Sequence, residues 1–184
     1  MTVTFGPDHI VFVSYEFPWS GLHPHGVLPA ARVRDVSTAF QPEIRTVSGE
    51  TLFLSADDAP GLVSFCLRHG IAEVARYDVW GDLLEPFLDT EFGVEDQEAC
   101  VSRLVAAGLA RGEVSSIRER FAPLMESYNF DSMLWEWTHL GLFDLLRALN
   151  GTLVDPVLPA RLGDLSEVYR WAMGIADYGR AKAS

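Results

Sequence analysis

Strand-like sequence is confined to the first third of this chain, and the remainder is helical wherever it has a clear period. Residues 9–17 are rich in β-branched and aromatic side chains and end at Pro18, and residues 32–39 form a second candidate strand. Residues 43–47 and 50–54 are joined by a two-residue loop that ends in glycine, which is the pattern of a tight hairpin. Because strands and helices do not alternate, the sequence disfavours a parallel βαβ arrangement and predicts an α+β fold.

These runs predict a small N-terminal antiparallel sheet of three or four strands with one face that needs cover. A covering helix is expected between Ser55 and Gly70: Ser55 or Asp57 can cap its start, Pro60 is tolerated in a first turn, and Gly70 stops it. Residues 18–29 contain three prolines and two glycines, so the sequence predicts a loop there.

Four to five helices are expected to follow. Asp78 is placed to cap the first, which Pro86 should interrupt, and Asp131 is placed to begin a long helix that Asn150 and Gly151 end. The expected helical segments are residues 78–84, 94–107, 113–128, 131–149 and 164–178.

The chain has 184 residues, enough for one domain or for two small ones. The change of structural class near residue 75 divides it into a small α+β region, residues 1–75, and a helical region, residues 76–184. The two regions can also form one compact domain together.

Acidic residues outnumber basic ones by 26 to 14, which gives a net charge of −12. This charge repels the phosphates of nucleic acids and of anionic lipids, so we expect neither nucleic acid nor membrane as a partner. The chain shows no signal-peptide pattern and no apolar stretch as long as a membrane span, which indicates a cytoplasmic protein. Lysine occurs once against thirteen arginines, a bias typical of GC-rich bacterial coding sequences.

The usual catalytic and cofactor-binding motifs are missing from the sequence. It contains no P-loop, no dinucleotide-binding glycine loop, no nucleophile elbow, no H-E-x-x-H and no C-x-x-C. The lone Lys182 lies near the end of the chain, which disfavours a buried Schiff-base lysine. Cys66 and Cys100 lie in apolar helical patterns, so we expect free, buried thiols. We therefore expect no cofactor, with a divalent metal ion as the one exception to consider.

Two carboxylate patterns offer ligands for a divalent metal ion. Glu136 lies three residues before His139 on the expected long helix, so both side chains would project from one helical face, the spacing of di-metal sites in helical bundles. Glu85 and Asp89 would lie one helical turn apart and offer oxygen ligands to a hard cation. The sequence thus gives Glu85, Asp89, Glu136 and His139 as candidate metal ligands.

Each pattern also has a simpler interpretation. Glu136, His139, Asp144 and Arg147 share one arc of the expected long helix, which is the ordinary solvated face of an amphipathic helix. The other two candidates belong to an acidic block that contains no base and can act as solvated surface or as helix caps. This block consists of Asp78, Asp82, Glu85, Asp89, Glu91, Glu95, Asp96 and Glu98.

His23 and His25 form a third candidate, because a His-x-His pair can ligate a transition metal. Pro24 between them restricts the geometry, and two exposed loop histidines are the simpler interpretation. His139 could supply a third ligand if this loop folded over the helical region.

Aromatic residues are abundant, with five Trp, eleven Phe and five Tyr, and most must lie in the core. Phe143 falls within the polar arc of the expected long helix, and Trp135 falls near its edge. Partly exposed aromatic side chains anchor interfaces, so a homodimer through this helix is one interpretation and cover by another part of the chain is the other.

Two functions from different classes fit these observations. The first is a non-enzymatic protein that acts through protein–protein contacts, as a homo-oligomer with an acidic surface. The second is a metal-dependent enzyme, hydrolase-like, in which carboxylates and an imidazole hold an ion that lowers the pKa of a bound water. Nucleic-acid mimicry by the acidic block is a weaker third, because Leu, Phe and Val are interleaved with its acids.

Overall fold

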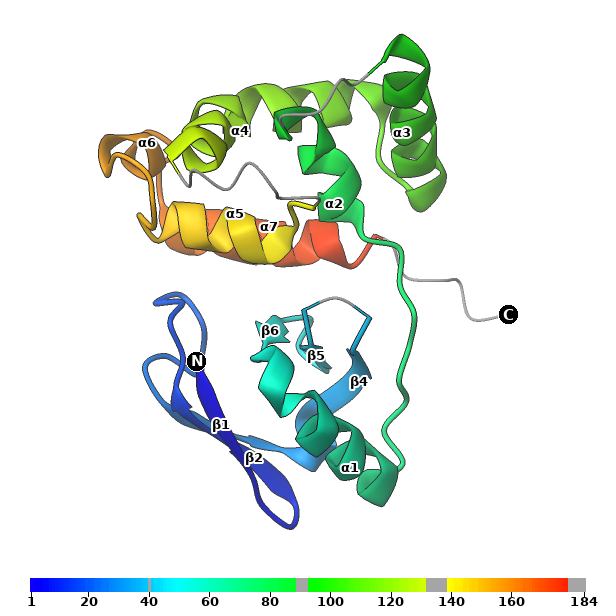
Figure 1. Cartoon of the computed structure of the whole chain (residues 1–184), viewed down its shortest axis with the longest axis vertical. Coiled ribbons are helices and arrows are strands. Elements are labelled where there is room, and N and C mark those ends of the chain that lie inside the picture. Colours follow the sequence, from blue (N-terminus) through cyan, green and yellow to red (C-terminus); the bar gives the residue numbers. More distant parts are fainter. Residues whose placement is uncertain (40, 89–92, 132–138, 179–184) are drawn as a thin grey trace. The chain divides into compact units, whose positions relative to one another are not determined.

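The chain adopts an α+β fold, as the sequence predicts (Figure 1). This computed structural model describes residues 1–39, 41–88, 93–131 and 139–178. The chain divides into two compact units, Met1–Arg76 and Tyr77–Ser184. The first unit contains the strands and one α-helix, and the second is helical.

The first sheet of unit 1 consists of β1 (Thr2–Phe5), β2 (His9–Ser14) and β3 (Gly26–Pro29), antiparallel and in that order. We call it sheet A. Ile10 and Phe12 on the central strand are fully buried, while Val13 is exposed, as the two-residue period of a strand requires.

The second sheet of unit 1 consists of β4 (Val33–Ser37), β5 (Glu43–Thr46) and β6 (Thr51–Phe53), also antiparallel and in that order. We call it sheet B. Its strands β5 and β6 form the expected hairpin, whose turn places Gly49 at a φ of 88°.

Sheet B is buried on both faces. Val36, Ile44 and Leu52 lie side by side in register and are at most 1% exposed. On the opposite face the buried Asp35 pairs with Arg34 over 3.0 Å and with Arg76 over 2.5 Å. A buried carboxylate needs such partners, because burial without them would be costly.

Two strands were not expected from the sequence. Thr2–Phe5 carried no assignment, and Gly26–Pro29 falls within residues 18–29, where proline and glycine predicted a loop. The observed strand β3 is short, and Pro29 ends it, which a strand tolerates because a proline there leaves few ladder hydrogen bonds unmade. The sheet of three or four strands is therefore two sheets of three.

Helix α1 (Ala59–His69) covers the apolar side of unit 1. Ser55 begins the preceding 3-10 turn, Ala56–Asp58, with a reciprocal cap to Asp58, and Gly70 ends the helix at a φ of 64°. Leu62, Phe65 and Cys66 are the buried side chains of this helix. A Cβ on Gly61 would lie 2.5 Å from the Phe5 ring, so the close approach of α1 to β1 requires glycine there.

Unit 2 contains the following helices within its described residues: α2 (Val79–Leu84), α3 (Val94–Ala107), α4 (Arg111–Asp131), α5 (Leu142–Leu149), α6 (Val157–Ala160) and α7 (Leu165–Ala176). Its core is aromatic. Trp80 is fully buried, meets Phe121 and Trp171 edge-on at centroid distances of 5.9 Å, and donates its indole N–H to the carbonyl of Ala172.

The expected continuous helix over residues 131–149 is wrong. Asp131 ends α4, His139 and Leu140 are not helical, and α5 begins after Gly141. Asp144 accepts the N–H of Gly141 over 2.9 Å, the arrangement of a helix start, and this competes with continuation of the helix through glycine.

The polar arc built on that helix fails with it. Asp144 is only 6% exposed, so it does not belong to a solvated face. Phe143 is half-buried and lies under the guanidinium of Arg147, 5.8 Å from its carbon to the ring centroid. Trp135 lies outside the described residues.

Both cysteines are free and buried, as expected. Among the described residues, no helix is both long enough and apolar enough to cross a membrane.

Candidate functional site

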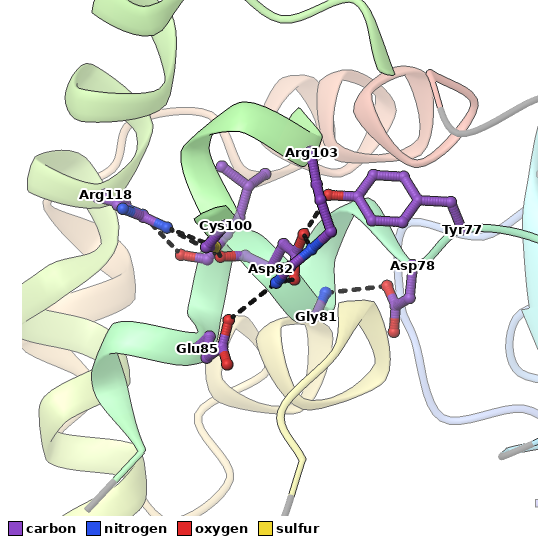
Figure 2. A network of polar contacts seen from close by, with 9 residues as sticks. Tyr77, Asp78, Gly81, Asp82, Glu85, Cys100, Arg103 and Arg118 are labelled. Atoms are coloured by element: carbon purple, nitrogen blue, oxygen red, sulfur yellow. Dashed lines mark hydrogen bonds and ion pairs between the residues drawn. The ribbon is translucent and has the colours of Figure 1, made fainter. Parts of the chain in front are cut away.

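A network of polar side chains surrounds α2, and several of its contacts lie at the two ends of this helix (Figure 2). Asp78 caps the start of this helix by accepting the N–H of Gly81 over 2.9 Å. The helix ends at Leu84, because Pro86 follows and a 3-10 turn, Glu85–Phe87, replaces the next helical turn.

Pro86 leaves one specific backbone group without its helical partner. The carbonyl of Asp82 would accept an N–H from the residue four positions later, and that residue is Pro86, which has none. Two side chains replace the missing donor: the thiol of Cys100 and Nη2 of Arg118 each donate to this carbonyl over 3.0 Å. Arg118 also donates to the carbonyl of Leu83 and to the sulfur of Cys100.

The Asp82 side chain is held on the opposite side by Arg103 of α3. Nε and Nη2 of Arg103 donate to the two carboxylate oxygens over 2.7 Å each, a bidentate pair, and the Tyr77 hydroxyl donates to the same carboxylate. Glu85 lies 3.6 Å from Arg103 Nη2 and so neighbours the same guanidinium. We call Tyr77, Asp82, Glu85, Cys100, Arg103 and Arg118 the α2 network.

The electrostatics of the α2 network follow from these contacts. Burial raises the pKa of the Cys100 thiol to about 11, with the negative charge of Asp82 as a second cause. Burial and the hydrogen bond to Asp82 raise the pKa of the Tyr77 hydroxyl well above its ordinary value. The bond to Asp82 likewise raises the pKa of the Arg103 guanidinium. At neutral pH the thiol and the phenol are therefore protonated and the guanidinium is charged.

Three members of the α2 network could in principle hold a metal ion. Asp82, Glu85 and Cys100 each offer a ligand atom, and these atoms lie within 4.8 Å of one another. A metal requires a thiolate and free carboxylate lone pairs. Here the thiol is protonated and donates to a carbonyl, and Arg103 occupies both oxygens of Asp82. A bound ion would have to take the place of the thiol proton that Cys100 donates to the Asp82 carbonyl, so the contacts present are those of a helix-end cap.

A second group surrounds His139, close to the start of α2. Nε2 of His139 donates to Asp78 over 2.9 Å, and both side chains are a little over one third exposed. This hydrogen bond raises the pKa of His139, burial opposes the shift, and the charges of Asp78, Asp144 and Glu85 add to it. The charged imidazolium is thus favoured in a strongly acidic neighbourhood.

Two glycines make room for this pair. A Cβ on Gly81 would lie 2.8 Å from Cε1 of His139 and 3.1 Å from Cγ of Asp78. A Cβ on Gly141 would lie 3.3 Å from Nε2 of His139 and 3.4 Å from Oδ2 of Asp78. The His139–Asp78 pair therefore depends on the missing side chain at Gly81.

Asp144 completes this group from α5. Its carboxylate accepts the N–H of Gly141 and, over 3.3 Å, the hydroxyl of the buried Tyr128. Burial raises the pKa of Asp144, and the two hydrogen bonds and the charge of His139 oppose that rise. The carboxyl therefore caps α5 and links it to α4.

The structure describes half of the metal ligands that the sequence predicts. Glu85 and His139 both belong to unit 2, and the charge of Glu85 acts on His139. Asp89 and Glu136 lie outside the described residues, so the predicted four-ligand set stays a prediction. His139 is not on a helix, which removes the geometric basis for pairing it with Glu136. His23, in unit 1, bonds the carbonyl oxygen of Tyr15 over 2.8 Å.

The sequence did not predict the long-range partners of Asp82. Asp82 meets Arg103 across twenty-one positions and Arg118 across thirty-six, and no local period predicts such pairs. One signal was present: a proline four residues after Asp82 implies an unsatisfied carbonyl and hence a donor from elsewhere.

Comparison with protein-family models, with curated proteins and with solved structures finds no match to this chain.

Proposed function

We propose that this chain is a non-enzymatic, cytoplasmic bacterial protein that acts through protein–protein contacts and forms a homo-oligomer. One observation carries the proposal: four of the polar side chains around α2 that could take part in acid–base or metal chemistry are engaged in holding helix ends. Asp78 caps α2, Asp144 caps α5, and Cys100 and Arg118 satisfy the carbonyl that Pro86 leaves open.

Exposed apolar side chains give the proposal its positive support. Val13, Val27 and Leu67 are 56%, 55% and 80% exposed in unit 1, and Phe130 is 82% exposed in unit 2. Single exposed apolar residues are ordinary, but grouped ones mark interaction surfaces. Val13 and Val27 belong to neighbouring strands of one sheet, so they are grouped.

The native mass of the purified chain tests the homo-oligomer directly. Light scattering after size-exclusion chromatography, repeated over a range of protein concentrations, should give a mass well above the 20.4 kDa of one chain at the highest concentration. A mass of 20.4 kDa at every concentration would contradict the proposal.

A metal-dependent hydrolase is the alternative, and the 4.8 Å grouping of Asp82, Glu85 and Cys100 is the observation that favours testing it. Elemental analysis of the untagged protein, as purified and after incubation with zinc, manganese or iron, gives the metal content per chain. We expect far less than one ion per chain. Near-stoichiometric metal that Asp82→Asn removes would contradict the helix-cap role of these residues and favour the alternative.

A further inference from the structure

The strands of sheet A carry no acid, and the outward positions around the centre of the sheet are β-branched. Val11 on the central strand lies between Thr4 of β1 and Val27 of β3 in register, and Val13 follows two residues later on β2. Thr4, Val13 and Val27 are exposed and Val11 is half-exposed. We call Thr4, Val11, Val13 and Val27 the neutral face. At its end lies His9, whose Nδ1 pairs with Asp8 over 2.7 Å.

Only one face of sheet A is exposed, because the side chains on the other face of the same strands are buried. Val3, Ile10, Phe12 and Leu28 point the other way and are at most 8% exposed. A soluble sheet usually carries polar or charged residues on its outward positions. Here the outward positions are valine and threonine, the residues that pack well when a second sheet covers them.

The net charge of the chain indicates which partner is best suited to cover the neutral face. The chain carries −12, and two copies repel each other wherever their acids meet. Residues 1–76 hold eight acids and five bases, whereas residues 77–184 hold eighteen acids and nine bases, so the repulsion is smallest around unit 1. A basic partner protein would be drawn to the acids of unit 2, which the neutral face lacks. The surface best suited to a second copy is the one without acids.

We propose that the neutral face of sheet A is where a second copy of this chain docks, sheet against sheet about a two-fold axis. This assignment rests on the proposed function, because it names the surface through which the homo-oligomer forms. An isologous contact of this kind places the same residues on both sides, so Val13 and Val27 of each copy contribute to it.

The size of the face determines how strong the contact is. Three strands spaced about 4.8 Å apart, with up to six residues at about 3.3 Å each, offer roughly 300 Å² per copy. Stable complexes bury about 800 Å² per partner. The neutral face therefore gives a weak dimer that dissociates on dilution, unless the loops beside the strands add to it.

The test compares surface valines of equal exposure. Val13→Lys with Val27→Lys places a charge twice on the neutral face, and Val47→Lys places one on the β5–β6 turn, where the valine is 53% exposed. Sedimentation equilibrium over about 1 to 100 µM gives the dissociation constant of each variant, and circular dichroism checks the fold. A second pair, Val13→Thr with Val27→Thr, keeps the β-branched shape and serves if the lysine pair does not fold.

We expect the lysine pair to weaken dimerisation at least tenfold, the threonine pair to weaken it less, and Val47→Lys to leave it within twofold. We also expect the wild-type dimer to tighten from about 50 to about 500 mM NaCl, because salt screens repulsion between acidic copies. A dimer that salt dissociates would be held by opposite charges and would overturn the assignment.

The remaining outcomes separate this inference from the proposed function. A dimer that neither valine pair affects would refute the neutral face and leave the homo-oligomer standing. An equal loss with Val47→Lys would trace the effect to added charge and would also refute the face. A wild-type chain that stays monomeric throughout would refute both.

Discussion

Arg118 donates Nη2 to the carbonyl oxygen of Asp82 over 3.0 Å, which is the carbonyl that Pro86 deprives of its helical donor. The same guanidinium reaches the carbonyl of Leu83, so a single side chain of α4 closes the end of α2. An interrupted helix normally leaves its last carbonyls to water. Here they are part-buried, and the arginine makes the interruption stable.

Arg118→Met should therefore destabilise the protein. The variant keeps much of the apolar length of the side chain but leaves two part-buried carbonyls with fewer donors, which costs about 1–3 kcal/mol. Urea unfolding followed by circular dichroism measures the loss. Arg111→Met is the control, because Arg111 and Glu98 are both more than half exposed and such an exposed pair contributes little to stability.

The cause can be tested separately from the size of this loss. If Arg118 compensates for Pro86, its removal should cost less when Pro86→Ala has restored a backbone N–H at position 86. An equal cost in both backgrounds would mean that Arg118 stabilises α4 packing and not the end of α2.

Cys66 and Cys100 should react slowly with a thiol reagent in the native protein. Burial raises the pKa of each thiol to about 11, and only the thiolate is reactive. Ellman's reagent at pH 8 should modify both only as fast as the chain unfolds, whereas urea should release two thiols at once. Rapid modification of one native thiol, mapped to Cys100 by mass spectrometry, would show that the α2 network opens.

The sequence predicted those parts of the fold that depend on local chemistry. Gly70 ends a helix, Asp78 caps another, and the hairpin turn holds Gly49. Each of these residues acts on backbone groups only a few positions away in the sequence, so its effect can be predicted without a structure.

Several features that the sequence did not predict depend on contacts between residues that are distant in the sequence. Strand β3 exists because Gly26–Pro29 pairs with His9–Phe12, and a long-range pairing overrides the local preference of proline and glycine for a loop. The break at Gly141 was missed because Leu142–Leu149 continues an apolar period that also fits the residues before it. Arg103 and Arg118 are far from Asp82 in the sequence and contact it only in the folded chain. The sequence could therefore indicate that the Asp82 carbonyl needs a donor, but not which residue supplies it.

His139 should make stability depend on pH in the neutral range. Its folded pKa lies above the ordinary 6.5 because of Asp78, so the folded state binds this proton more tightly than the unfolded state. The stabilisation is fully present below about pH 6.5 and is lost as the pH rises through the folded pKa.

The difference in urea midpoint between wild type and His139→Asn, measured from about pH 5.5 to 9, isolates this effect from other titrating groups. The difference should favour wild type most at the acid end of that range and shrink toward the alkaline end. A difference that is constant with pH would show that His139 contributes by packing alone.

Gly81→Ala should separate the His139–Asp78 pair. Alanine normally stabilises a helix by about 0.5–1 kcal/mol relative to glycine. At position 81 its Cβ would lie 2.8 Å from the imidazole, so His139 must move away from Asp78 and the pKa of His139 should fall toward its ordinary value. Proton NMR titration of the imidazole measures this fall.

Gly174→Ala in α7 is the matched control, since its Cβ meets nothing within 4 Å; it should stabilise the helix and leave the His139 titration unchanged. If both variants gain stability equally and the His139 titration does not move, the glycine at position 81 is not what admits the pair.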